Sequence, residues 1–148
     1  MKLTHLDEEG QARMVDVSEK QLIKRMAVAE GKLFFSELTY EIVRSGGLPK
    51  GGPIETARLA GIQAAKRTNH LIPLCHDLNL DWVDVQIEVQ RDGFMIHSQV
   101  HCRWATGVEM EALVAVSVAA LTLYDMCKAV DKDMVIGAIQ LVKKIKGG

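Results

Sequence analysis

Two runs of alternating apolar and polar residues constrain the fold of this chain most strongly. Apolar residues occupy every second position from Val83 to Val89, and most second positions from Phe94 to Trp104. This alternation is typical of strands that bury one face and expose the other. Asp92-Gly93 between the two runs favours a tight turn. The pattern predicts an antiparallel hairpin with one buried face.

Helical patterns lie on both sides of this hairpin. Glu37–Arg44 reads as a short helix that stops at Ser45-Gly46-Gly47. Pro53 suits the first turn of a second helix, in which small and apolar residues recur at helical spacing. Gly107–Val130 is apolar nearly all round, which predicts burial on several sides, in part by another subunit. Further extended segments are expected near residues 14–17, 26–35 and 134–142, and a loop is expected over residues 70–80. Together, these expected helices and strands predict an α+β sandwich, in which helices pack on one face of an antiparallel sheet.

Composition and charge restrict the class of protein. A chain of 148 residues has the usual length of one domain, so a single domain is expected over residues 1–148. The formal net charge is −1, which gives no overall basic field for nucleic acid or an anionic membrane. The expected sheet also lacks the interleaved aromatic residues of RNA-binding folds. Neither nucleic acid nor a membrane is expected as a partner.

The cysteines and the first residues indicate the compartment. The 3 cysteines form no C-x-x-C pair, so neither a disulfide framework nor a zinc ribbon is expected. Residues 1–10 are polar and lack the apolar core of a secretory signal. The longest apolar stretch, residues 113–124, is too short to span a bilayer. His97 and His101 share a strand face, but such histidines more often decorate a solvated sheet. A cytoplasmic protein without a metal site is expected.

Two pairs of charged residues on the long expected helix could carry chemistry. Asp125 and Lys128 share one face and can form either a surface ion pair or a pair that transfers protons and holds phosphate. Glu109 and Glu111 lie in the first turn, where acids also simply complement the helix dipole. Glu111 and Asp125 are about 21 Å apart along a helix. A site that uses both therefore joins two chains, or the chain has two sites.

Other candidates lie around the second expected helix. Lys50-Gly51-Gly52 precedes this helix and can offer main-chain N–H groups and a positive charge to phosphate. Glycine pairs are also common in loops, however, and the Walker order is absent. Arg58 and Lys66 add cations along the helix, or form a solvated face. Cys75-His76 leaves open a nucleophile with its base, a pair of metal ligands, or neither.

Five stretches of the chain carry a more specific signal. They read MVDV at 14–17, TARLAGIQAAKRT at 56–68, LIPLCH at 71–76, GVEMEALVAVSVAALTLYDMCKA at 107–129 and KDMVIG at 132–137. GVEMEAL and LYDMCKAV together in one small protein are highly specific. With these stretches, most of the chain resembles the cyclic pyranopterin monophosphate synthase family, the MoaC family of molybdenum cofactor biosynthesis.

The resemblance implies a fold, an assembly and a reaction. The family has a ferredoxin-like α+β fold and forms hexamers built from dimers, with the active site between subunits. It is a lyase family that converts 3′,8-cyclo-7,8-dihydroguanosine 5′-triphosphate to cyclic pyranopterin monophosphate and releases diphosphate. No cofactor is implied, and the partners are the small-molecule substrate and further copies of the chain.

Roles for individual residues follow from the matching motifs. The resemblance implies that Asp125 and Lys128 are the catalytic acid/base pair. Lys50 is implied to face the triphosphate. The full set of implied substrate-binding residues is Leu74, Cys75, His76, Met110, Glu111, Lys50, Arg58, Lys66 and Glu109.

The chain departs from the family pattern at several places. Gly52 stands where the family usually has Asp, and Asp77 stands where it usually has Pro. The loop between Arg103 and Gly107 is shorter, and the usual Gly-Gly-Lys-Ser-Gly tail is represented only by the lysines of residues 143–146. These departures motivate an alternative hypothesis, a divergent, non-catalytic relative that binds a purine nucleotide or a pterin.

Overall fold

The computed structural model describes residues 2–147, and these residues form one antiparallel sheet with helices against it. The sheet order is β2-β3-β1-β4, and every neighbouring pair is antiparallel. Strands and helices follow a β-α-β-β-α-β order, so the ferredoxin-like α+β prediction is confirmed. The elements are β1 (Ile23–Phe34), α1 (Glu37–Ser45), α2 (Pro53–Lys66), α3 (Thr68–Leu71), β2 (Leu80–Gln90), β3 (Gly93–Trp104), α4 (Glu109–Cys127) and β4 (Val135–Lys146).

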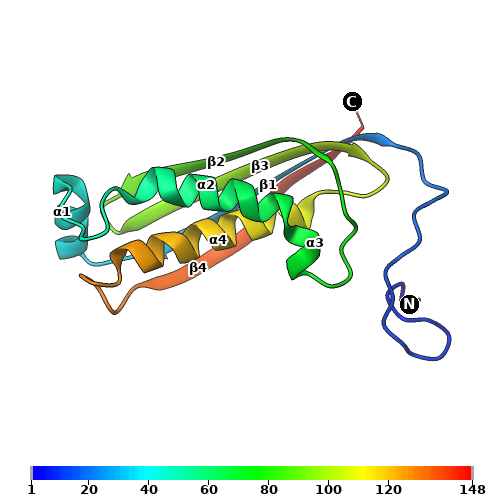
Figure 1. Ribbon diagram of the computed structural model, residues 1–148, viewed down its shortest axis with the longest axis horizontal. Coiled ribbons are helices and arrows are strands. Elements are labelled where there is room, and N and C mark those ends of the chain that lie inside the picture. The colour runs from blue at the N-terminus through cyan, green and yellow to red at the C-terminus, as the bar shows by residue number, and fades with distance from the viewer. Residues whose placement is uncertain (1, 148) are drawn as a thin grey trace.

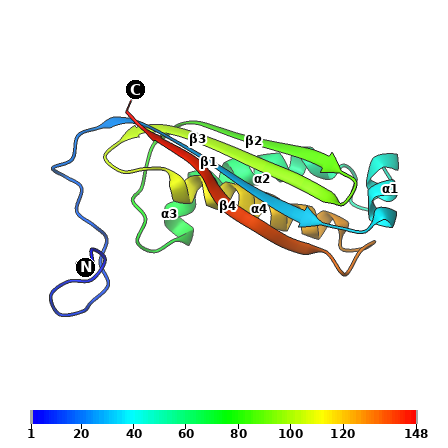
Figure 2. The ribbon, with the colours of Figure 1, turned by 180° about the vertical axis from the view of Figure 1, so that it is seen from behind.

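Helices α2 and α4 cover one face of the sheet, as Figures 1 and 2 show from opposite sides. The core lies between the two layers, because the buried side chains of β1 and β3 alternate toward the helices. Gly61 lets α2 approach α4 closely, since a Cβ atom there would lie 2.9 Å from the main-chain oxygen of Ala115. The other face of the sheet carries mainly polar and partly exposed side chains.

The long apolar helix is the centre of this core. α4 is long and apolar enough to cross a membrane by length and composition, but 56% of that apolar window is buried inside the protein. It contacts α2 on one side and the sheet on the other. The helix is two to three residues shorter at each end than the 107–130 expected from sequence. Its hydrophobicity is therefore explained in large part by its place in the core.

The hairpin and the ends of the chain differ in detail from the sequence prediction. The tight turn is Arg91-Asp92, because Gly93 already pairs with Gln90 as the first residue of β3. β4 extends to Lys146, since its pairing with β1 continues to Arg25 and supports even its lysine-rich end. The segment expected to be extended at residues 14–17 pairs with no strand.

Short connections place two loops at opposite ends of the layers. α1 lies beyond the end of the sheet, near the β2–β3 turn (Figure 1). Ser36 caps its first turn, and Gly46, with a φ of 76°, ends it in the left-handed conformation that suits glycine. The α1–α2 connection then carries Lys50. The 72–79 loop, which follows α3, lies toward the end from which the N-terminal segment leaves (Figure 1).

Candidate functional site

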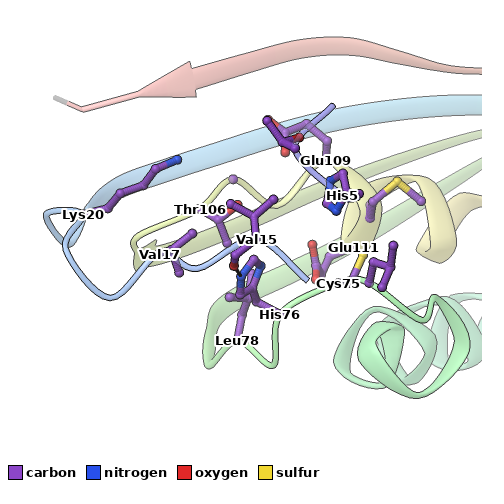
Figure 3. Close-up of a pocket in the computed structure, with 14 residues that line it drawn as sticks. His5, Val15, Val17, Lys20, Cys75, His76, Leu78, Thr106, Glu109 and Glu111 are labelled. Atoms are coloured by element: carbon purple, nitrogen blue, oxygen red, sulfur yellow. Dashed lines mark hydrogen bonds between the residues drawn. The ribbon is translucent and has the colours of Figure 1, made fainter. Parts of the chain in front are cut away.

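A pocket of about 340 Å³ opens beside the first turn of α4. The 72–79 loop forms one wall, the start of α4 forms another, and the N-terminal segment crosses over both (Figure 3). Six residues expected at the site from sequence line this pocket together: Leu74, Cys75, His76, Glu109, Met110 and Glu111. Two motifs more than thirty positions apart in the sequence thus meet at one cavity.

Hydrogen bonds from the sheet hold the α4 wall of the pocket. The hydroxyl of Ser98 donates to the main-chain oxygen of Ala112 at 2.7 Å, one residue beyond Glu111. The Arg25 guanidinium donates to the carbonyls of Trp104, the last residue of β3, and Ala105, the next residue, at 3.3 and 3.1 Å. These contacts fix the direction in which the first turn of the helix presents its side chains.

Glu111 is the most unusual acid in the pocket. Its side chain is only 5% exposed. Burial raises its pKa from the ordinary 4.5 to about 7, and the neighbouring Glu109 adds to the shift. A carboxyl with this pKa is present in both protonation states near neutral pH, so it can accept or give a proton.

Cys75 lies beside Glu111 in the same pocket (Figure 3). Burial, and then the charge of Glu111, raise the pKa of its thiol. The thiol is therefore neutral around pH 7, whereas a thiolate is what nucleophilic or metal-binding chemistry requires. The raised pKa argues against a nucleophilic thiol and a metal-binding thiolate at Cys75, and the substrate contact that the resemblance implies stays a prediction.

The N-terminal segment contributes pocket residues that the sequence reasoning did not select. Val15 and Val17 line the cavity, and the main-chain oxygen of Val15 lies 2.6 Å from Nε2 of His76. Lys20 adds a cation at the rim (Figure 3). The sequence signal for this region is the stretch MVDV at 14–17, which resembles the family but indicates no role for individual residues.

A second cluster lies at the other end of α4. Lys50 Nζ lies 2.9 Å from Asp125 Oδ2, and Lys128 Nζ lies 3.1 Å from Asp125 Oδ1. Hydrogen bonds from Lys50 and then Lys128 hold the pKa of Asp125 below its usual range. All three side chains are about half exposed, at 45 to 57%. The structure thus joins the expected acid/base pair to the lysine expected to face phosphate.

The two clusters do not form one site within a single chain. Glu111 and Asp125 lie on the same continuous helix, which separates them by about 21 Å. The geometry agrees with the sequence argument that a site using both ends joins two copies of the chain, or that the chain has two sites.

Comparisons with known proteins show the family to which the chain belongs. The model of the MoaC family matches residues 14–147. The chain belongs to the MoaC family. It is 54% identical over 147 residues to the cyclic pyranopterin monophosphate synthase of Pelotomaculum thermopropionicum, covering 98% of this chain and 86% of the relative. It is 52% identical to the synthase of the same name from Magnetococcus marinus, covering 98% of this chain and 90% of the relative.

One of the relatives is about twice as long as this chain. The chain is 54% identical to a molybdenum cofactor biosynthesis bifunctional protein of Chlorobaculum tepidum. The match covers 99% of this chain but only 47% of that protein, so this MoaC-family chain corresponds to about half of the bifunctional protein.

Two predicted cations of this MoaC-family chain lie outside both clusters. Arg58 donates to the main-chain oxygen of Val85 at 2.8 Å and pairs with Glu55 at 3.1 Å. Lys66 and Asp77 line a second pocket, of about 620 Å³. The roles of both cations toward a substrate stay predictions. Asp77, which stands where the family usually has Pro, lines this second pocket and not the pocket beside Glu111.

The histidines of the sheet do not gather metal-binding groups around them. Among residues 2–147, no three His, Cys, Asp or Glu side chains are arranged to hold a metal ion. His101 instead contacts Gln99 at 2.8 Å and packs edge-on against Trp82. The expectation of no metal site stays a prediction.

Proposed function

We propose that this chain is a cyclic pyranopterin monophosphate synthase. The reaction is the conversion of 3′,8-cyclo-7,8-dihydroguanosine 5′-triphosphate to cyclic pyranopterin monophosphate and diphosphate. The observation that carries the proposal is that the LCH and ME motifs of the family line one pocket. The Asp-Lys pair of the family also forms an ion-pair cluster with Lys50. The chain is about half identical to named synthases over nearly its whole length.

The Lys50–Asp125–Lys128 cluster is suited to phosphate and proton chemistry. Two ammonium groups on one carboxylate leave a net positive charge, which favours a triphosphate through charge-assisted hydrogen bonds. When phosphate oxygens engage the lysines, Asp125 loses part of its stabilisation as an anion and becomes a better proton acceptor. We assign to Asp125 and Lys128 the proton transfers that accompany ring opening and closure.

The pocket beside Glu111 is suited to the ring system of the substrate. It combines apolar walls from Leu74, Val15 and Met110 with a titrating carboxyl and an imidazole. Such a mixture orients a flat polar ring by a few hydrogen bonds. Lys20 at the rim provides a further cation for the negatively charged part of the substrate.

The functional unit is a homo-oligomer, a hexamer built from dimers, in which each site is completed by two chains. The distance between Glu111 and Asp125 supports this assembly. Exposed apolar side chains on the outer faces of α2 and α4, Leu59 at 57% and Leu121 at 59%, also support it, because water-exposed leucines favour burial against a partner. The location is the cytoplasm.

The decisive experiment is incubation of the purified protein with the cyclised guanosine triphosphate, following diphosphate release and identifying the pterin by mass spectrometry. Repeated turnover to cyclic pyranopterin monophosphate is expected. Asp125→Ala and Lys128→Ala should each abolish the product while circular dichroism shows an intact fold. Binding of the substrate by the wild-type oligomer without any release of diphosphate would favour the non-catalytic relative instead.

A further inference from the structure

A buried carboxylate joins two distant segments of the chain next to the Asp125 cluster. Asp131 is 9% exposed. Its Oδ2 accepts a hydrogen bond from the hydroxyl of Thr39 at 2.8 Å and one from the amide of Ser36 at 3.2 Å. Its Oδ1 accepts from the amide of Asp133 at 2.9 Å. Thr39 is 1% exposed, so this hydrogen bond is sealed from water.

Each of the joined segments carries one part of the cluster. Ser36 and Thr39 form the start of α1, and the connection that follows α1 carries Lys50. Asp131 follows the end of α4, whose last turn carries Asp125. Because α1 lies beyond the end of the sheet (Figure 1), no strand pairing fixes it relative to α4.

The ion pair between Lys50 and Asp125 is a weak anchor by itself. Both side chains are about half exposed, and such pairs contribute little because water screens them and two long side chains must be ordered. A buried hydrogen bond to a carboxylate is stronger and geometrically stricter. Burial would raise the pKa of Asp131, yet hydrogen bonds from Asp133, Thr39 and Ser36 outweigh burial and lower it, so Asp131 stays an anion that holds its donors firmly.

We propose that the hydrogen bond between Thr39 and Asp131 positions Lys50 against Asp125, which makes Thr39 and Asp131 positioning residues for the acid/base cluster. The role in turnover rests on the proposed function. The placement of Lys50 does not, because it is a property of the folded chain and can be measured without substrate.

Thr39→Val tests the contact, since it keeps the shape of the side chain and removes the donor. Thr68→Val is the matched control. Thr68 is also 1% exposed and also donates its hydroxyl, but to the main-chain oxygen of Ala65 in the last turn of α2. Thr39→Ser restores the donor and should restore wild-type behaviour.

The first measurement is the titration of the Asp125 carboxyl by carbon NMR, with Asp125→Asn to assign the resonance. Lys50→Met removes the lysine that lowers the pKa of Asp125 most, so the pKa of Asp125 should rise in this variant. Thr39→Val should move the pKa of Asp125 in the same direction, upward, while Thr68→Val leaves it unchanged. In the Lys50→Met background, Thr39→Val should have no further effect. An unchanged Asp125 titration in a folded Thr39→Val protein would overturn the proposal.

The second measurement is turnover. Thr39→Val should lower kcat by roughly tenfold or more, the scale of a misplaced catalytic group, and Thr39→Ser should recover it. If Thr39→Val does not fold, Asp131→Asn replaces it. It keeps the shape of the side chain but removes the negative charge that holds the Thr39 and Ser36 donors, so it should raise the pKa of Asp125 and lower kcat in the same way. A wild-type protein without diphosphate release would refute the proposed function, and the Asp125 titration would still decide the positioning role.

Discussion

Nε2 of His76 lies 2.6 Å from the main-chain oxygen of Val15, and this contact joins the 72–79 loop to the N-terminal segment. A carbonyl oxygen only accepts hydrogen bonds, so Nε2 is the nitrogen that carries hydrogen. The segment that covers the pocket pairs with no strand, so this hydrogen bond is a direct link between the segment and the 72–79 loop.

Replacement of His76 by Phe should loosen the cover of the pocket. The ring volume stays, but the donor to Val15 is lost, at a cost of about 1 kcal/mol. Amide hydrogen exchange around residues 14–18 should accelerate, while exchange in β1 and β3 stays slow. His70→Phe, at an exposed position of α3, is the matched control. Equal protection of residues 14–18 in both variants would show that the segment is held by other contacts.

The raised pKa of Glu111 predicts a pH-dependent stability. The folded protein holds the Glu111 proton up to pH about 7, whereas an unfolded chain releases it near 4.5. The free energy of unfolding should therefore fall as pH rises from about 4.5 to 7, and then level off. Glu111→Gln removes this loss, so the variant should be more stable than wild type above pH 7, by at most roughly 3 kcal/mol.

Urea unfolding between pH 4.5 and 8 checks this prediction. Glu88→Gln, at an exposed position of β2, is the control and should keep the wild-type slope. The assignment to Glu111 is wrong if Glu111→Gln keeps that slope as well.

Gly52 gives a prediction about the start of α2. It is the N-cap of that helix and makes no side-chain capping bond. Its φ of −67° is open to any residue, and a Cβ atom there would meet nothing within 4 Å. Gly52→Asp should therefore raise the free energy of unfolding by a few tenths of a kcal/mol up to about 1. Gly51→Asp should lower it instead, because φ at Gly51 is +87°. Thermal unfolding of the two variants checks the opposite signs.

The sheet and its helices were largely predictable because their signals are local. Alternation over β2 and β3 determines which side chains face the helices, and Gly46 and Pro53 mark helix ends by their backbone preferences. β4 was underestimated because its lysine-rich end gains its strand conformation from pairing with β1, which is a tertiary effect.

The site was predictable through motifs and not through physics alone. Nothing in the residue pattern indicates that Cys75 and Glu111 meet, because the 72–79 loop comes next to α4 only through tertiary packing. Val15 accepts the His76 hydrogen bond through its main-chain oxygen, and a pattern of side chains cannot predict a main-chain contact. The Thr39–Asp131 contact spans 92 positions and was equally hidden.

α4 runs without a break from Glu109 to Cys127, so its two ends never meet in one chain. In the proposed assembly, a chain substituted at Glu111 that pairs with a chain substituted at Asp125 places both defects in the same site. A mixed dimer then contains one site built from two intact ends, and random pairing gives about a quarter of all sites this composition. Two inactive alleles of this kind would complement each other in one cell, whereas two lesions at the same end of the helix would not.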